Sequence, residues 1–185
     1  MMMKKMVVQM SEKEFKLKFA KELKSLGYKV YLDEHLEDFP IFHTTITGGK
    51  PDLLFFHNIP KLLPAVLLEL KTSEKLGNII DGIVEQLEGK YKEKYSNFNK
   101  NPLNKIKLED GTVWNMPVLL GFSTDTAYEK GVVYEKNGWA DGLTATRIIE
   151  RILWKNDMCL VLRNSYGRIV ISYKNSYYHL NERGW

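Results

Sequence analysis

The chain has 185 residues, which suits one domain with a single core and is short for two ordinary domains. Hydrophobic residues make up 44% and charged residues 27%, a balance that excludes a disordered or fibrous protein. The formal net charge of +4 attracts polyanions only weakly, so charge by itself identifies no partner.

The single cysteine and the short apolar runs restrict the chemistry and the compartment. Cys159 lies in the apolar run 158–162, so no internal disulfide can form and we expect a buried strand cysteine. The first ten residues contain only a three-residue apolar stretch, and no other run reaches the length of a membrane span. We therefore predict a cytoplasmic protein without membrane contact.

The first predicted element is a helix over residues 11–26, followed by a strand over residues 28–32. Ser11 and Glu14 have the spacing of a capping box, and Gly27 ends the helix. The apolar positions of the helix recur at helical spacing: Phe15, Phe19, Leu23 and Leu26.

Two strongly apolar segments predict the central strands of a sheet. Residues 52–56 follow a Gly48-Gly49 break, and residues 65–71 follow a loop that carries two prolines. Continuous apolar runs of this kind are typical of strands that are covered on both faces.

The remaining elements complete an α/β pattern. The sequence predicts, in order, a helix over 78–95, a long surface loop over 97–111, a buried strand over 118–123, a short strand over 131–134, a helix over 144–155, and a hairpin of 158–163 with 168–173. We expect a mixed sheet of four or five strands with helices on both faces. The domain spans 1–185, with a core over about 11–123 and a C-terminal extension over about 124–185.

Charged residues interrupt the two central strands at one end. If the strands pair antiparallel with Phe56 opposite Ala65, then Asp52 lies opposite Glu69. Because strand side chains alternate, Glu69 and Lys71 share a face. Two carboxylates and an ammonium group therefore converge on an otherwise apolar hairpin.

Neighbouring buried carboxylates repel each other, and a divalent cation relieves that cost. Asp52, Glu69 and the backbone carbonyl of Leu70 form a sufficient ligand set for Mg²⁺ or Mn²⁺, which retain several waters. Lys71 could orient or deprotonate a metal-bound water or stabilise charge on a phosphate. The alternative is structural: Glu69 and Lys71 form a salt bridge at a strand end, while Asp52 caps the turn at 48–49.

The residues Pro51-Asp52 and Glu69-Leu70-Lys71 resemble the signature of the PD-(D/E)XK nuclease superfamily, which includes resolvases and RecB-like enzymes. The resemblance covers about residues 11–123, where the predicted order of elements also agrees. It implies a restriction-endonuclease-like core, with the C-terminal helix and β-hairpin outside it. It also implies divalent-metal-dependent hydrolysis of DNA phosphodiester bonds.

In many members of that superfamily a glutamate of the first helix completes the metal site. The resemblance assigns this role to Glu14, with Glu12 and Glu22 as alternatives. Gln86 and Tyr91 resemble the glutamine and tyrosine that several RecB-like members carry after the motif, although their spacing here is one residue longer. Gln86 is accordingly a candidate catalytic residue.

Other residues admit weaker functional interpretations. The four histidines are scattered without a zinc-binding spacing, although His43 or Lys50 could contact a phosphate near the hairpin. Basic and aromatic residues alternate in the last third, which fits either a nucleic-acid surface or ordinary core and subunit contacts.

The function expected from these residues is a metal-dependent deoxyribonuclease with DNA as its partner. The alternatives are a structure-selective resolvase of the Holliday-junction type, which would require a homodimer, and a non-catalytic DNA-binding protein that retains the nuclease fold.

Overall fold

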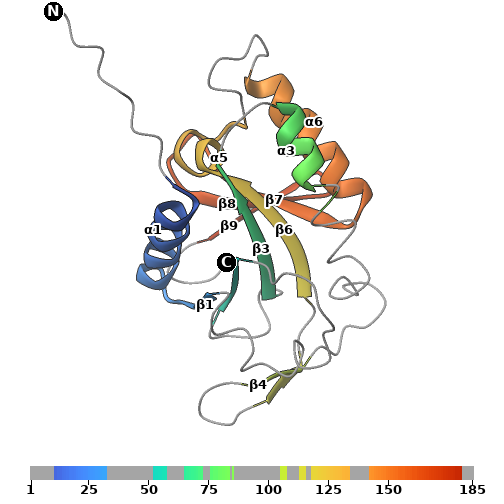
Figure 1. The fold of residues 1–185 in the computed structure, drawn as a ribbon. Coiled ribbons are helices and arrows are strands. Elements are labelled where there is room, and N and C mark those ends of the chain that lie inside the picture. Colours follow the sequence, from blue (N-terminus) through green and yellow to red (C-terminus); the bar gives the residue numbers. More distant parts are fainter. Residues whose placement is uncertain are drawn as a thin grey trace, which may run out of the picture.

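A computed structural model describes residues 11–32, 52–57, 65–72, 76–83, 85, 105–107, 113–115, 118–133 and 142–180. The chain is mixed α/β (Figure 1). Its elements, in chain order, are α1 (Glu12–Ser25), β1 (Tyr28–Leu32), β2 (Leu53–His57), β3 (Ala65–Lys71), α3 (Leu76–Gly82), β4 (Lys105–Lys107), β5 (Val113–Asn115), β6 (Val118–Thr124), α5 (Asp125–Lys130), α6 (Gly142–Lys155), β7 (Met158–Arg163), β8 (Ile169–Tyr173) and β9 (Ser176–His179).

Helix α1 begins and ends at the residues that its sequence predicts. The Ser11 side chain accepts a hydrogen bond from the Glu14 backbone N–H at 3.1 Å, which satisfies one of the unpaired donors of the first turn. Gly27 follows the helix with a φ of 91°, a left-handed conformation that glycine adopts without steric cost. The Ser11 cap and Gly27 thus mark the two ends of α1, and β1 begins directly after Gly27.

The main sheet has seven strands in the order β1-β2-β3-β6-β7-β8-β9. The three strands β3, β6 and β7 run parallel, and the pairs at both ends of the sheet are antiparallel. The predicted sheet of four or five strands is therefore too small. The C-terminal hairpin is confirmed, but β7 pairs with β6, so the hairpin and β9 extend the main sheet.

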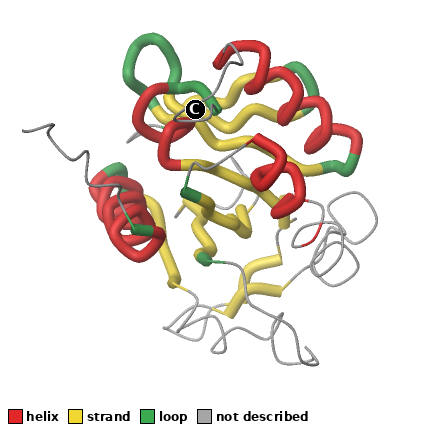
Figure 2. Tube along the Cα trace, turned by 45° about the horizontal axis from the view of Figure 1, so that its top comes forward, coloured by secondary structure: helices red, strands yellow, loops and turns green. Residues whose placement is uncertain are grey.

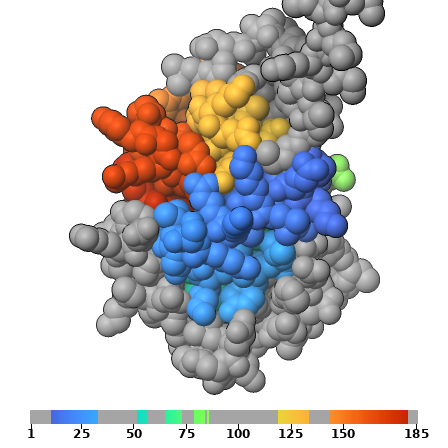
Figure 3. Space-filling model, turned by 90° about the vertical axis from the view of Figure 1, so that its left-hand side faces the viewer, coloured from blue at the N-terminus to red at the C-terminus, as the bar shows by residue number. Residues whose placement is uncertain are grey.

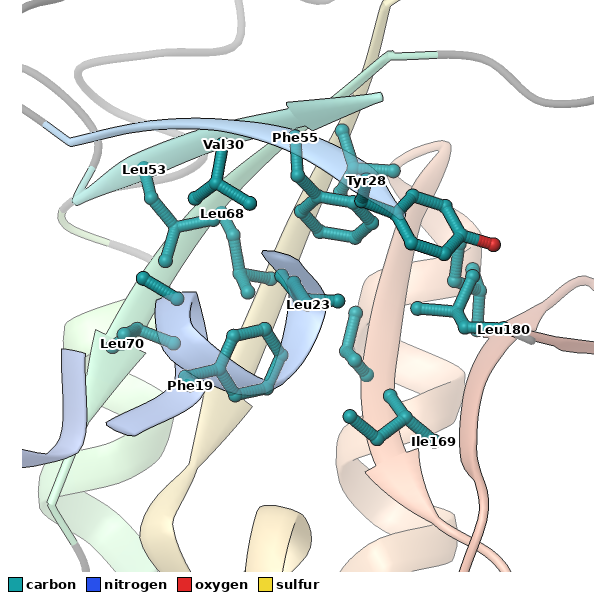
Figure 4. Packing of buried hydrophobic residues seen from close by; sticks show 14 of the residues in the cluster. Phe19, Leu23, Tyr28, Val30, Leu53, Phe55, Leu68, Leu70, Ile169 and Leu180 are labelled. Atoms are coloured by element: carbon teal, nitrogen blue, oxygen red, sulfur yellow. The ribbon is translucent and has the colours of Figure 1, made fainter. Parts of the chain in front are cut away.

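Helices cover both faces of the sheet, as predicted (Figures 1 and 2). Helix α1 packs on one face, where Phe19 and Leu23 meet alternate residues of the strands, such as Leu68 and Leu70 (Figure 4). Helices α3 and α6 pack on the other face, against a second cluster that includes Leu67. Because β3 is covered on both sides, its apolar residues are continuous rather than alternating.

Three segments differ from what the sequence predicts. No element was predicted between β6 and residue 131, where the structure has the short helix α5, which Thr124 caps at its start and Gly131 ends with a φ of 74°. Residues 131–133 form no strand, since the Val133 N–H donates to the Thr146 side chain at 2.8 Å. The loop expected over 97–111 contains β4, which pairs with β5 in a separate two-stranded sheet.

Helix α3 occupies the start of the helix predicted over 78–95, and residues 86–95 lie outside the described part of the chain. None of the helices that the structure describes has the length and apolar character needed to cross a bilayer.

Candidate functional site

The pairing of β2 with β3 brings the predicted charged residues together. Leu53 pairs with Leu68 and Phe55 with Val66, which confirms the predicted register. Asp52 immediately precedes β2, beyond the last paired residues, and its carboxyl group lies within hydrogen-bonding reach of the Glu69 side chain. The hairpin therefore sets two acidic side chains side by side at the C-terminal end of β3.

Asp52 is held to β3 by its backbone and by its side chain. Its N–H donates to the Leu68 carbonyl at 3.0 Å, and its Oδ2 accepts from the Leu70 N–H at 2.7 Å. The carboxylate thus takes the place of a backbone acceptor in the ladder. Since the N–H and C=O of one strand residue point toward the same neighbouring strand, the Leu70 carbonyl also faces the Asp52 side.

Glu69 is the buried member of the pair. It is only 5% exposed, and the alternation of β3 directs it to the same side as Ala65 and Leu67, toward α3. Desolvation, repulsion from Asp52 and a hydrogen bond with the Asp52 carboxyl raise the pKa of Glu69 from 4.5 to about 9, although the Lys71 charge opposes this rise. Burial beside Asp52 therefore favours the protonated form of Glu69.

Lys71 lies at the rim of the same site. Its side chain is 26% exposed and runs beside α3, where a methyl group added to Gly82 would lie 3.4 Å from Lys71 Cε. Its Nζ is 4.0 Å from Glu12 Oε1 on α1. Lys71 also pairs in register with Thr124 at the end of β6. The ammonium group thus lies where β3, β6, α1 and α3 meet.

Among the three candidate glutamates of α1, the structure places Glu12 next to the site. Glu12 contacts Lys71, and its charge contributes to the raised pKa of Glu69. Glu14 is exposed and lies about 200° around the helix from Glu12, at 100° per residue. Glu22 instead binds Arg163 through both carboxylate oxygens, at 2.9 and 3.1 Å.

The phase of α1 could have identified Glu12. Phe15 and Phe19 lie three and seven residues after Glu12, so all three share the face that packs on the sheet. Thr124, the register partner of Lys71, uses its hydroxyl group to cap α5, where it accepts a hydrogen bond from the Ala127 N–H at 3.0 Å.

Four residues with predicted roles lie outside the described part of the chain, namely Gln86, Tyr91, Lys50 and His43. Within the described part of the chain, no group of three or more His, Cys, Asp and Glu side chains is arranged to hold a metal ion. Among the described residues, the oxygen atoms that face this site are those of the Asp52 and Glu69 carboxyl groups and of the Leu70 carbonyl.

Comparisons with protein-family models, with curated proteins and with solved structures find no significant match to the chain.

Proposed function

We propose that this protein is a divalent-metal-dependent nuclease that hydrolyses DNA phosphodiester bonds at the Asp52–Glu69–Lys71 site. One observation carries the proposal: the β2–β3 register sets two carboxyl groups against each other, one of them buried, with a lysine beside them. The mixed α/β fold also supports the proposal, because it brings Asp52 and Glu69-Leu70-Lys71, which resemble the nuclease signature, together on adjacent segments of the sheet.

The site fits a divalent cation because its main cost is the burial of negative charge. Glu69 takes up a proton to avoid that cost, and a bound cation would replace the proton. Asp52 and Glu69 would be the carboxylate ligands, and the Leu70 carbonyl would be a third. A small number of protein ligands suits Mg²⁺, which gives up its waters reluctantly. When bound, the ion supplies a Lewis acid that polarises a phosphate and acidifies a water.

The remaining chemistry belongs to the side chains of this chain. Lys71 is positively charged and partly desolvated, so it stabilises the negative charge that develops on the phosphate in the transition state. Glu12 is a positioning residue that holds the Lys71 ammonium at the rim of the site. The Asp52 hydrogen bond to the Leu70 N–H keeps the two strand ends together, and with them the carboxyl pair.

The direct test is cleavage of labelled DNA in single-stranded, duplex and four-way-junction forms, with Mg²⁺, Mn²⁺ or EDTA. We expect metal-dependent cleavage by the wild-type protein and none by Asp52→Asn or Glu69→Gln, because each variant removes a charged metal ligand. Glu129→Gln is the matched control, since Glu129 is an exposed acid on α5 that pairs with Lys18.

Cleavage of the junction alone would identify the resolvase form of the activity. DNA binding without cleavage of any form would favour a non-catalytic DNA-binding protein. Cleavage by Asp52→Asn at the wild-type rate would contradict the assignment of the site.

A further inference from the structure

The turn between β7 and β8 has a firmly held backbone and presents a tyrosine to solvent. The Asn164 side chain accepts from the N–H groups of Tyr166 and Arg168, at 3.0 and 2.9 Å. Gly167 closes the turn with a φ of 77°, and its carbonyl accepts from Arg163 at 2.6 Å. On this fixed backbone the Tyr166 side chain is 87% exposed.

Arg163 also joins the turn to α1. Its guanidinium donates to both Glu22 oxygens and lies 4.9 Å from the centre of the Tyr128 ring. Its Nε donates to the Tyr128 carbonyl at 2.8 Å. The turn therefore keeps a constant position beside the C-terminal half of α1, and both contribute to the face seen in Figure 3.

The adjoining surface of α1 is basic. Lys21 and Lys24 are exposed, and their spacing of three residues makes them neighbours on the helix. Glu22, the acid between them in sequence, is engaged by Arg163. Arg168 is exposed on the turn itself. We name Lys21, Lys24, Tyr166 and Arg168 the α1–turn surface.

We infer that the α1–turn surface binds a single-stranded segment of DNA, an inference that rests on the proposed function for the identity of the polymer. Three cations suit the phosphates, and an exposed ring on a fixed backbone provides a stacking platform for an unpaired base. A duplex would offer the same phosphates but hide the faces of its bases.

Helix α1 connects this surface with the proposed catalytic site. Glu12, at its first turn, contacts Lys71, and Lys21 lies nine residues further on, about 14 Å along the helix axis. Lys13 is exposed at the end nearer the catalytic site. Lys21 is also about 180° around the helix from Glu12, so α1 relates the two sites through its length and not through a shared face.

The test is fluorescence anisotropy with a labelled single-stranded oligonucleotide and with the same sequence as a duplex, in EDTA so that no cleavage occurs. Tyr166→Ala should weaken binding to the single strand by about 5- to 100-fold, and Tyr166→Phe by no more than about twofold, because stacking uses the ring. The duplex should bind the three proteins alike.

The salt dependence tests the cations separately. Lys21→Gln/Lys24→Gln should lower the slope of log affinity against log salt by about 1.4, for two phosphate contacts on a single strand. Arg151→Gln/Lys155→Gln is the matched control. It removes the same charge from exposed positions of α6, on the opposite face of the sheet, and should leave the slope unchanged.

Three results would overturn the inference: no binding by the wild-type protein at low salt, equal binding by Tyr166→Ala and wild type, or equal effects of the two double variants. Cleavage without a dependence on Tyr166 would overturn this inference and leave the proposed function standing. Binding that depends on Tyr166, without cleavage in Mg²⁺ or Mn²⁺, would overturn the proposed function and leave this inference standing.

Discussion

Glu69 and Glu150 are both buried glutamates of this protein, and their surroundings are opposite. Glu69 is 5% exposed on β3, and Glu150 is 1% exposed on α6. Glu150 accepts hydrogen bonds from the Ser172 hydroxyl, from the Tyr177 hydroxyl at 3.0 Å and from Arg147 at 3.1 Å. Glu69, in contrast, lies against the carboxyl group of Asp52, whose charge and hydrogen bond both raise the pKa of Glu69.

The contrast shows that burial alone does not mark a functional carboxylate. The donors around Glu150 replace the water lost on burial, so its charge is compensated and it joins α6 to β8 and β9. The Asp52 carboxyl group raises the free energy of ionising Glu69, and binding of a proton or a cation lowers that cost. A buried acid that lies against a second acid is thus the one to examine for metal binding.

The largest expected effect is on turnover, and it distinguishes Lys71, which lies beside Glu69, from Arg147, which binds Glu150. Lys71→Ala should lower turnover by about 10²- to 10³-fold, comparable with the loss of one preorganised donor, while DNA binding in Ca²⁺ stays nearly unchanged. Arg147→Ala is the counterpart at Glu150, with a side chain that is 53% exposed, and should leave turnover unaltered. Single-turnover cleavage assays measure both.

Lys71→Arg separates two roles of the lysine. Partial recovery of turnover indicates charge stabilisation, whereas no recovery indicates a general base, because a guanidinium keeps its proton. Loss of metal and DNA binding together in Lys71→Ala, with an intact fold, would reduce Lys71 to a phosphate anchor.

The second prediction concerns stability in EDTA. Glu150→Gln should lower the free energy of unfolding by about 2–3 kcal/mol, because an amide offers its three donors one acceptor oxygen and no charge. Glu69→Gln should leave stability unchanged or raise it, because it removes the cost of ionising a buried acid beside Asp52. Urea denaturation near pH 8 compares them. Equal losses in both variants would show that Glu69 also has a structural role.

The third prediction is a pH dependence that belongs to Glu69. Its pKa is about 9 in the folded protein and 4.5 without the fold, so over that range the folded chain keeps a proton that the unfolded chain has released. The contribution of Glu69 is therefore a fall in the free energy of unfolding as pH rises from about 5 to about 9, by up to about 1.4 kcal/mol per unit. This slope should disappear in Glu69→Gln and persist in Glu150→Gln, in urea denaturation series without metal.

The smallest effect should distinguish the glutamates of α1. Glu12→Gln should lower turnover by about tenfold or less, because it removes an exposed charge that positions Lys71 from 4.0 Å away. Glu14→Gln, on the other side of the helix, should have no effect on turnover. The reverse ranking would restore Glu14 as the residue that completes the site.

Local patterns of the sequence determined much of this fold. Ser11 and Gly27 set the limits of α1, and the unbroken apolar runs of β2, β3 and β6 marked the centre of the sheet. The β2–β3 register followed as well, since a one-residue shift would move Glu69 to the opposite face. The pairing of Asp52 with Glu69 could therefore be predicted from the sequence.

Only the tertiary structure decided how distant segments meet. The pairing of β7 with β6, which enlarges the sheet to seven strands, joins residues nearly forty positions apart, and no local pattern encodes it. The donors around Glu150 come from α6, β8 and β9, so its compensated charge could not be distinguished from that of Glu69 in the sequence. The choice of Glu12 over Glu22 likewise depended on which end of α1 lies against Lys71, because helical phase selects a face of the helix, whereas packing selects its neighbour.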